Sequence, residues 1–237
     1  MRFATDIVQY RPDLLLVMHN INDLLVVYSA AVQGRSVDSS YHVKYARKSL
    51  TGYVDESDVV LSRLVAFVGD RLARLAPRQP RPVLEGYDIE AGRQIFARNL
   101  RSLVGLARAN GTQVVLVTMP VARSLARFED VAKLERGGAI DAFPTHERFL
   151  ADFDRYNETV REVGRELGAP VIDATRLVPP DDELFADLVH TTTDGVRAMG
   201  TAVASKLLGI LPPPREAGPE PVRRVEQGRS RPILQPD

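Results

Sequence analysis

An aspartate and a histidine stand three residues apart in the segment Asp187-Leu188-Val189-His190, directly ahead of the last predicted helix. At this spacing the Asp187 carboxylate can reach one imidazole nitrogen of His190 and leave the other nitrogen facing a cleft. Such a pair is the orienter and general base of a hydrolytic triad. The spacing alone also suits a surface histidine beside a turn or cap residue, and taken by itself it favours that structural interpretation.

A second polar segment, His19 to Asp23, follows the apolar run Leu14 to Met18. The side-chain amide of Asn22 could donate hydrogen bonds to an oxyanion that forms in a transition state. Asn22 and Asp23 would equally serve as turn and cap residues of the next helix. His19, Asn20 and Asp23 would border the same pocket. A metal site built from His19, Asp23 and His190 has no recognised ligand spacing behind it, so we expect neither metal nor cofactor.

Three continuous apolar runs predict buried parallel strands that would position these residues: 14–18, 114–119 and 171–172. Helical patterns lie between and after them, at about 96–107, 156–167 and 193–208, and glycines stop each one. Strands that alternate with helices indicate an α/β fold with a parallel sheet. Ligands bind beyond the carboxyl ends of such strands, which is where both polar segments fall.

The domain organisation is predicted to be one α/β domain, 1–211, with an insertion at about 34–92 that interrupts the alternation. Apolar residues at helical spacing between Leu61 and Leu75 predict one amphipathic helix in the insertion, which we expect to pack on the main body. The segment 212–237 is rich in proline and charge and lacks apolar periodicity, so it is predicted to be a disordered tail.

Composition restricts the classes of partner. The 237 residues include 31 lysines and arginines and 31 aspartates and glutamates, so no net charge attracts nucleic acid or an anionic membrane. The absence of cysteine excludes disulfides and thiolate chemistry. No stretch reaches the roughly 18 apolar residues of a membrane span. We therefore expect a small-molecule partner and, for the chain as written, a cytoplasmic location unless a signal peptide lies upstream of Met1.

In order and context these segments resemble the SGNH (GDSL-type) hydrolases over about 10–33 and 93–210. The third family block, Gly-x-Asn-Asp, is matched by Asn20-Ile21-Asn22-Asp23, with Asn20 in place of glycine, and the fifth block, Asp-x-x-His, by Asp187 to His190. The resemblance implies a three-layer flavodoxin-like sheet of strand order 2-1-3-4-5. It also implies hydrolysis of small-molecule, lipid or acylated-sugar esters through an acyl-serine, with Asp187 as orienter, His190 as base and Asn22 in the oxyanion hole.

The nucleophile block of that family, Gly-Asp-Ser after the first strand, occurs nowhere in the sequence. In the family it precedes a segment like Phe3 to Arg11, so we expect the fold to be N-terminally incomplete and the chain as given to lack the catalytic serine. Two alternatives stay open: an O-acyltransferase of the same fold, and a non-catalytic SGNH-like binding protein.

Overall fold

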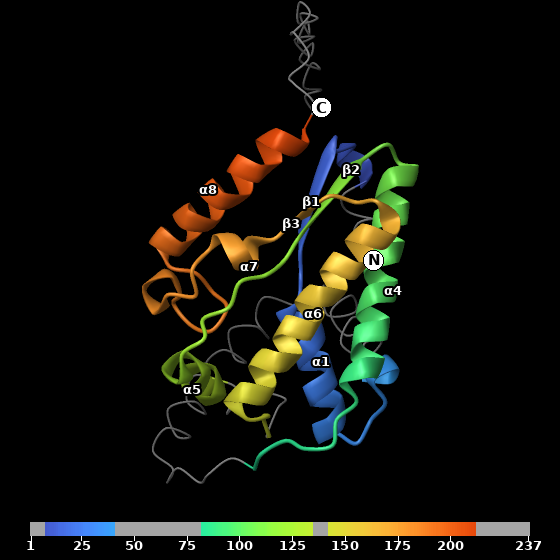
Figure 1. Cartoon of the computed structure of the whole chain (residues 1–237). Coiled ribbons are helices and arrows are strands. Elements are labelled where there is room, and N and C mark those ends of the chain that lie inside the picture. Colours follow the sequence, from blue (N-terminus) through green and yellow to red (C-terminus); the bar gives the residue numbers. More distant parts are fainter. Residues whose placement is uncertain (1–7, 41–81, 135–141, 212–237) are drawn as a thin grey trace, which may run out of the picture.

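The computed structural model describes residues 8–40, 82–134 and 142–211 (Figure 1). Three strands form a parallel sheet in the order β1-β2-β3, namely Leu14–Met18, Gln113–Val117 and Val171–Ile172. Leu14 is in register with Gln113, and Val117 with Ile172. The apolar runs of the sequence are thus the strands, although β2 ends at Val117, two residues before the end of its run.

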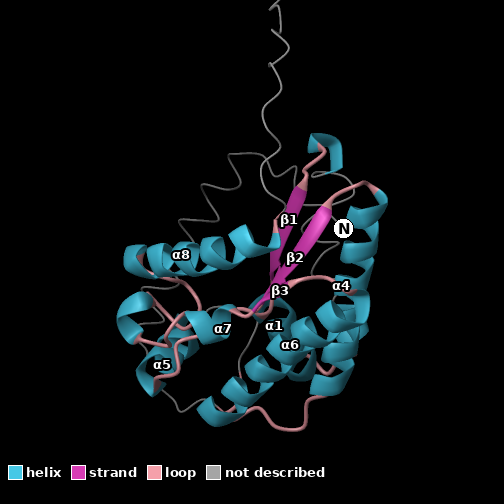
Figure 2. Ribbon diagram, turned by 45° about the horizontal axis from the view of Figure 1, so that its top comes forward, coloured by secondary structure: helices cyan, strands magenta, loops and turns pink. Residues whose placement is uncertain are grey.

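Helices cover both faces of this sheet in an α/β flavodoxin-like arrangement of three layers (Figure 2). One face packs against α1 (Ile21–Val32), α4 (Ile89–Ala109) and α6 (His146–Leu167). The other packs against α8 (Thr193–Ile210) and the short α7 (Ala174–Leu177). Side chains alternate between the layers, so that Leu15 and Val17 join the first core and Leu14 the second.

The short connecting elements lie outside these layers. They are the 3-10 turns η2 (Val8–Tyr10) and η5 (Asp182–Leu184), and the helix α5 (Leu125–Leu134). Figure 1 shows α5 beyond the carboxyl ends of the strands, on the same side as the loops that follow β2 and β3.

Capping residues set the ends of the long helices. The Asp88 side chain accepts a hydrogen bond from the backbone N–H of Ala91 at 2.9 Å at the start of α4. At the start of α6, the Thr145 side chain accepts a hydrogen bond from the backbone N–H of Arg148. Gly168 ends α6 with φ of 57°, a left-handed conformation that favours glycine. The predicted stops after these two helices are confirmed.

A close approach between helices depends on Gly92 in the first turn of α4. A Cβ atom at this position would overlap the side chains of Val27 on α1 and Tyr156 on α6. Both side chains are buried in the main core. The absence of a side chain at residue 92 therefore lets three helices pack together on one face of the sheet.

The predicted insertion lies mostly outside the described residues, together with its amphipathic helix and the C-terminal tail. Of its predicted range the structure describes residues 34–40 and 82–92, and α4 begins at Ile89. In the part of the chain that the structure covers, no helix is long and apolar enough to cross a membrane.

Candidate active site

Asp187 and His190 form a hydrogen-bonded pair on the loop between η5 and α8. The Asp187 Oδ2 lies 2.7 Å from the His190 Nδ1, and its Oδ1 accepts hydrogen bonds from the backbone N–H of His190 at 2.8 Å and Val189 at 2.9 Å. The Asp187 side chain is 19% exposed and that of His190 79%. A carboxylate held at three points thus orients an exposed imidazole, a geometry that suits a general base and its orienter.

Backbone hydrogen bonds join the two ends of the loop that carries Asp187 and His190. Phe185 and Thr191 form an antiparallel bridge, and the backbone N–H of Ala186 donates to the His190 carbonyl at 2.7 Å. Thr192 accepts a hydrogen bond from the Gly195 N–H as the N-cap of α8 and donates to the Glu183 carbonyl at 2.9 Å. Local hydrogen bonds therefore fix the backbone on both sides of His190.

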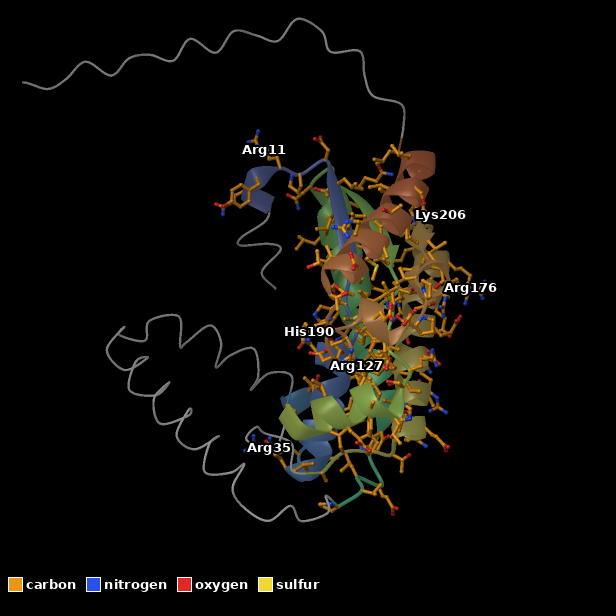
Figure 3. The ribbon with its side chains drawn as sticks, turned by 90° about the vertical axis from the view of Figure 1, so that its left-hand side faces the viewer. Arg11, Arg35, Arg127, Arg176, His190 and Lys206 are labelled. Atoms are coloured by element: carbon orange, nitrogen blue, oxygen red, sulfur yellow. The ribbon has the colours of Figure 1, made fainter. Side chains whose placement is uncertain are left out.

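Arg127 of α5 ties the same loop to the body of the molecule (Figure 3). Its guanidinium donates to the carbonyl of Ala186 at 3.1 Å and to that of Asp182 at 3.0 Å. The backbone N–H of Ala122 adds a bond to the Leu188 carbonyl at 2.9 Å. No local pattern in the sequence indicates this role of Arg127, because its partners are more than fifty positions away along the chain.

The environment of Asp187 favours its ionised form. Partial burial works toward a higher pKa, but the hydrogen bonds from the His190 and Val189 backbone and the contact with the His190 ring outweigh it. The pKa of Asp187 is therefore lowered from its ordinary value. An ionised Asp187 can accept a hydrogen bond from a proton on the His190 Nδ1.

The second polar segment lies at the carboxyl end of β1, as predicted. Asn22 is exposed in the first turn of α1. His19 pairs through its Nδ1 with the carboxylate of Asp23, which is buried, and the His19 ring stacks on Phe96 at a centroid distance of 6.5 Å. The pair fixes the turn from which Asn22 projects.

Asn20, which stands where the family has glycine, points inward. Its side chain is 1% exposed, and its Nδ2 donates to the Phe153 carbonyl of α6 at 3.2 Å. Its φ of −166° is extended backbone that any residue adopts. The Asn20 side chain therefore packs against α6.

A third polar cluster, which the sequence did not single out, surrounds Asp173 directly after β3. Thr118 donates to the Asp173 carboxylate at 2.8 Å, Thr175 at 2.6 Å, and Arg161 at 3.0 and 3.1 Å. Arg176 adds an ion pair with the same carboxylate at 3.2 Å. We interpret these residues as a structural cluster that joins β2, β3 and α6.

The described residues contain no cluster that could hold a metal ion, and none of their serines is hydrogen bonded to the His190 ring. No group of three or more histidine, cysteine, aspartate or glutamate side chains there could hold a metal ion. Over the same residues, the hydrogen bonds of the His190 ring are limited to the one with Asp187.

Comparison with known proteins identifies the family. The model of the GDSL-like lipase/acylhydrolase family matches residues 1–198. The chain belongs to this family. It resembles a GDSL-like lipase from Bacteroides thetaiotaomicron at 17% identity, covering 50% of this chain and 54% of the lipase, with a TM-score of 0.37. It also resembles a proposed acylhydrolase from Bacteroides fragilis at 19% identity, covering 54% and 55%, with a TM-score of 0.37.

This GDSL-like chain therefore spans about half the length of the solved structures that it matches. None of the curated proteins compared matches it. The family match includes the turn after β1 and the Asp187–His190 loop.

Proposed function

We propose that this chain carries the acid–base and oxyanion groups of an SGNH-type ester hydrolase that acts on a small-molecule ester. The observation behind the proposal is the Asp187–His190 pair, with Nδ1 held at 2.7 Å and the ring exposed at the carboxyl edge of a parallel sheet. Membership of a lipase/acylhydrolase family supports the same chemistry.

In the proposed reaction, the His190 Nε2 removes the proton of a serine hydroxyl as its oxygen attacks the ester carbonyl. The negative charge that develops on the carbonyl oxygen is stabilised by the Asn22 amide N–H, and Asp187 stabilises the imidazolium. His190 then gives its proton to the departing alcohol, which leaves an acyl-serine. Water repeats the sequence and releases the acid.

The nucleophile is the part of this reaction that the sequence does not match. Gly-Asp-Ser does not occur in the chain, and no described serine is hydrogen bonded to His190. We therefore expect residues 1–237 to hydrolyse a short-chain nitrophenyl ester no faster than the His190→Ala variant does, because the base has no covalent partner. Release of nitrophenolate measures this. Turnover that disappears in His190→Ala would instead show that a serine already in the chain serves as nucleophile.

In a form of the protein that turns over esters, the roles of the other groups can be separated. Asn22→Ala should lower kcat by about 10²-fold or more and change KM less, because the amide engages its ligand mainly in the transition state. Asp187→Ala and His190→Ala should each reduce kcat strongly. An Asn22→Ala variant with unchanged kcat would remove Asn22 from the oxyanion hole.

The missing Gly-Asp-Ser motif also favours a second candidate, an SGNH-like protein that binds a ligand without catalysis. A fluorophosphonate probe separates the two functions because it labels only an activated serine. Covalent labelling that requires His190 supports the hydrolase, whereas ligand binding without labelling supports the binding protein.

A further inference from the structure

Arg127 spans the start of the loop that carries the candidate base (Figure 3). Its Nη1 donates to the Ala186 carbonyl at 3.1 Å, and its Nη2 donates to the Asp182 carbonyl at 3.0 Å. The first carbonyl belongs to the residue directly before Asp187, and the second belongs to η5. One planar guanidinium group therefore fixes two points of the backbone that leads into Asp187.

The core of the molecule holds the helix from which Arg127 extends. Phe128, the next residue of α5, is 8% exposed, and its ring centroid lies 5.9 Å from that of Phe143 and 5.8 Å from that of Phe149. Both of these rings are buried in the main core. Neighbouring residues of a helix point about 100° apart, so Phe128 can pack into the core while Arg127 reaches the loop.

Arg127 acts on a part of the loop that lies between two buried side chains. Phe185 and Leu188 are fully buried, one on either side of Asp187. Ala186 is exposed and has only a methyl side chain. A hydrogen bond from a charged donor is roughly twice as strong as one between neutral groups, so the guanidinium group is a firm partner for the Ala186 carbonyl. Arg127 therefore ties the backbone directly before Asp187 to another helix.

We propose that Arg127 is a positioning residue for the Asp187–His190 pair. Its two hydrogen bonds hold the backbone before Asp187 in the place from which the carboxylate meets the imidazole. This inference rests on the proposed function for the roles of the pair as orienter and base. The positioning itself requires no turnover, so it can be tested on residues 1–237.

The first test follows the ring of His190 by NMR. The chain contains four histidines, so ¹⁵N-histidine labelling gives few ring signals, and His190→Ala assigns those of His190. An ionised carboxylate only accepts hydrogen bonds, so we expect the neutral His190 ring to carry its proton on Nδ1, 2.7 Å from the Asp187 Oδ2. Arg127→Ala should weaken this preference, because the backbone before Asp187 is released. An unchanged Nδ1–H population in Arg127→Ala would overturn the proposal.

Hydrogen exchange shows whether the effect is confined to the loop. The backbone N–H groups of Val189 and His190 donate to the Asp187 Oδ1, whereas that of Leu116 in β2 donates to the Pro170 carbonyl. Arg127→Ala should raise the exchange rates of the first two about tenfold or more, because two charge-assisted hydrogen bonds are lost. The exchange of Leu116 should not change. Equal acceleration at all three sites would overturn the proposal, because Arg127 would then stabilise the whole fold.

A lysine variant tests the fork of the guanidinium group and does not remove the charge. Arg127→Lys keeps the positive charge but loses the planar pair of nitrogens that reach two carbonyl groups. Both the ring preference and the exchange rates should lie between those of the unmodified chain and those of Arg127→Ala. Values equal to those of the unmodified chain would show that charge alone is sufficient, which would overturn positioning by the two hydrogen bonds.

Arg123 provides the matched control. It lies in the segment just before α5, and its guanidinium group pairs with the carboxylate of Asp154 on α6 at 2.5 Å. Arg123→Ala removes the same charge and side chain as Arg127→Ala does. It should leave the His190 ring and the exchange of Val189 unchanged. Equal effects of the two variants would overturn the proposal, because the loss of positive charge would then explain both.

Measurements of activity separate this proposal from the proposed function. In a form of the protein that turns over esters, Arg127→Ala should lower kcat by about 10-fold to 10²-fold and change KM less, because the base is misplaced. An active form whose kcat is unaffected would overturn the positioning role and leave the hydrolase. A changed His190 ring in Arg127→Ala, in a protein without esterase activity, would support the positioning role while removing the hydrolase.

Discussion

Asp173 shows how a single carboxylate can be held in its ionised form at the sheet edge. Partial burial would raise its pKa, but hydrogen bonds from Arg161, Thr175 and Thr118 outweigh this and hold the pKa at about 2, against an ordinary value of 3.8. Because the folded-state pKa is depressed, the stabilisation is present above the unfolded-state pKa and is lost as pH falls toward 2.

This arrangement predicts an acid-sensitive stability. A shift of this size corresponds to about 2 kcal/mol of unfolding free energy at neutral pH. Asp173→Asn should lose about that amount at pH 7, and its stability should fall less than that of the unmodified chain between pH 4 and pH 2. Urea unfolding at several pH values measures both. Glu166→Gln, which removes an exposed ion pair with Arg101, is the control and should change little. Parallel acid profiles for the chain and Asp173→Asn would contradict the prediction.

At the scale of elements, the packing of α1, α4 and α6 depends on which residue of α4 faces the core. A Cβ atom added at Gly92 would overlap the side chains of Val27 and Tyr156. A Cβ atom added at Gly105, thirteen residues along the same helix, would have no atom within 4 Å. The two glycines therefore differ in packing and share the same helical conformation.

Replacement by alanine should have opposite effects at these two positions. Gly92→Ala should destabilise the fold by roughly 1 to 3 kcal/mol, because buried neighbours must move. Gly105→Ala should stabilise it by up to about 1 kcal/mol, since alanine is the better helix former. Thermal unfolding followed by circular dichroism compares them. Equal melting temperatures for the two variants would show that the helices do not meet at residue 92.

At the scale of the whole molecule, the edge of β1 is the feature with the clearest consequence. β1 pairs with β2 on one side, and no strand in the described ranges pairs with its other side. Leu16 and Met18 are 43% and 44% exposed. An uncharged apolar edge strand is a site for association with other chains, and zero net charge provides no general repulsion.

We therefore predict that residues 1–237 self-associate through β1. Light scattering during size-exclusion chromatography should show a mass above that of the 26.2 kDa chain, increasing with concentration. Leu16→Lys should shift the population toward monomer, and Leu125→Lys, at a residue 56% exposed on α5, should not. A monodisperse monomer at all concentrations would refute this prediction.

Local patterns in the sequence were sufficient for several features of the fold and the site. Continuous apolar runs predicted β1, β2 and β3, because strands of a parallel sheet are typically continuous apolar runs. The predicted burial does not hold for β1, in which Leu16 and Met18 are exposed. The Asp187–His190 pair was predictable because its two members are three residues apart, and a loop of that length brings them together without help from the rest of the chain.

Other features depended on tertiary structure, because their partners are far apart in sequence. Arg127 donates to carbonyl groups more than fifty residues away, and Asn20 donates to the Phe153 carbonyl of α6. Met18, Met119 and Met199 line one cavity only because β1, β2 and α8 pack against one another. The sequence by itself determined which residues could act as base and orienter, since that geometry is local. The tertiary structure alone decided what surrounds them, since a cavity wall is assembled from segments whose spacing carries no periodic signal.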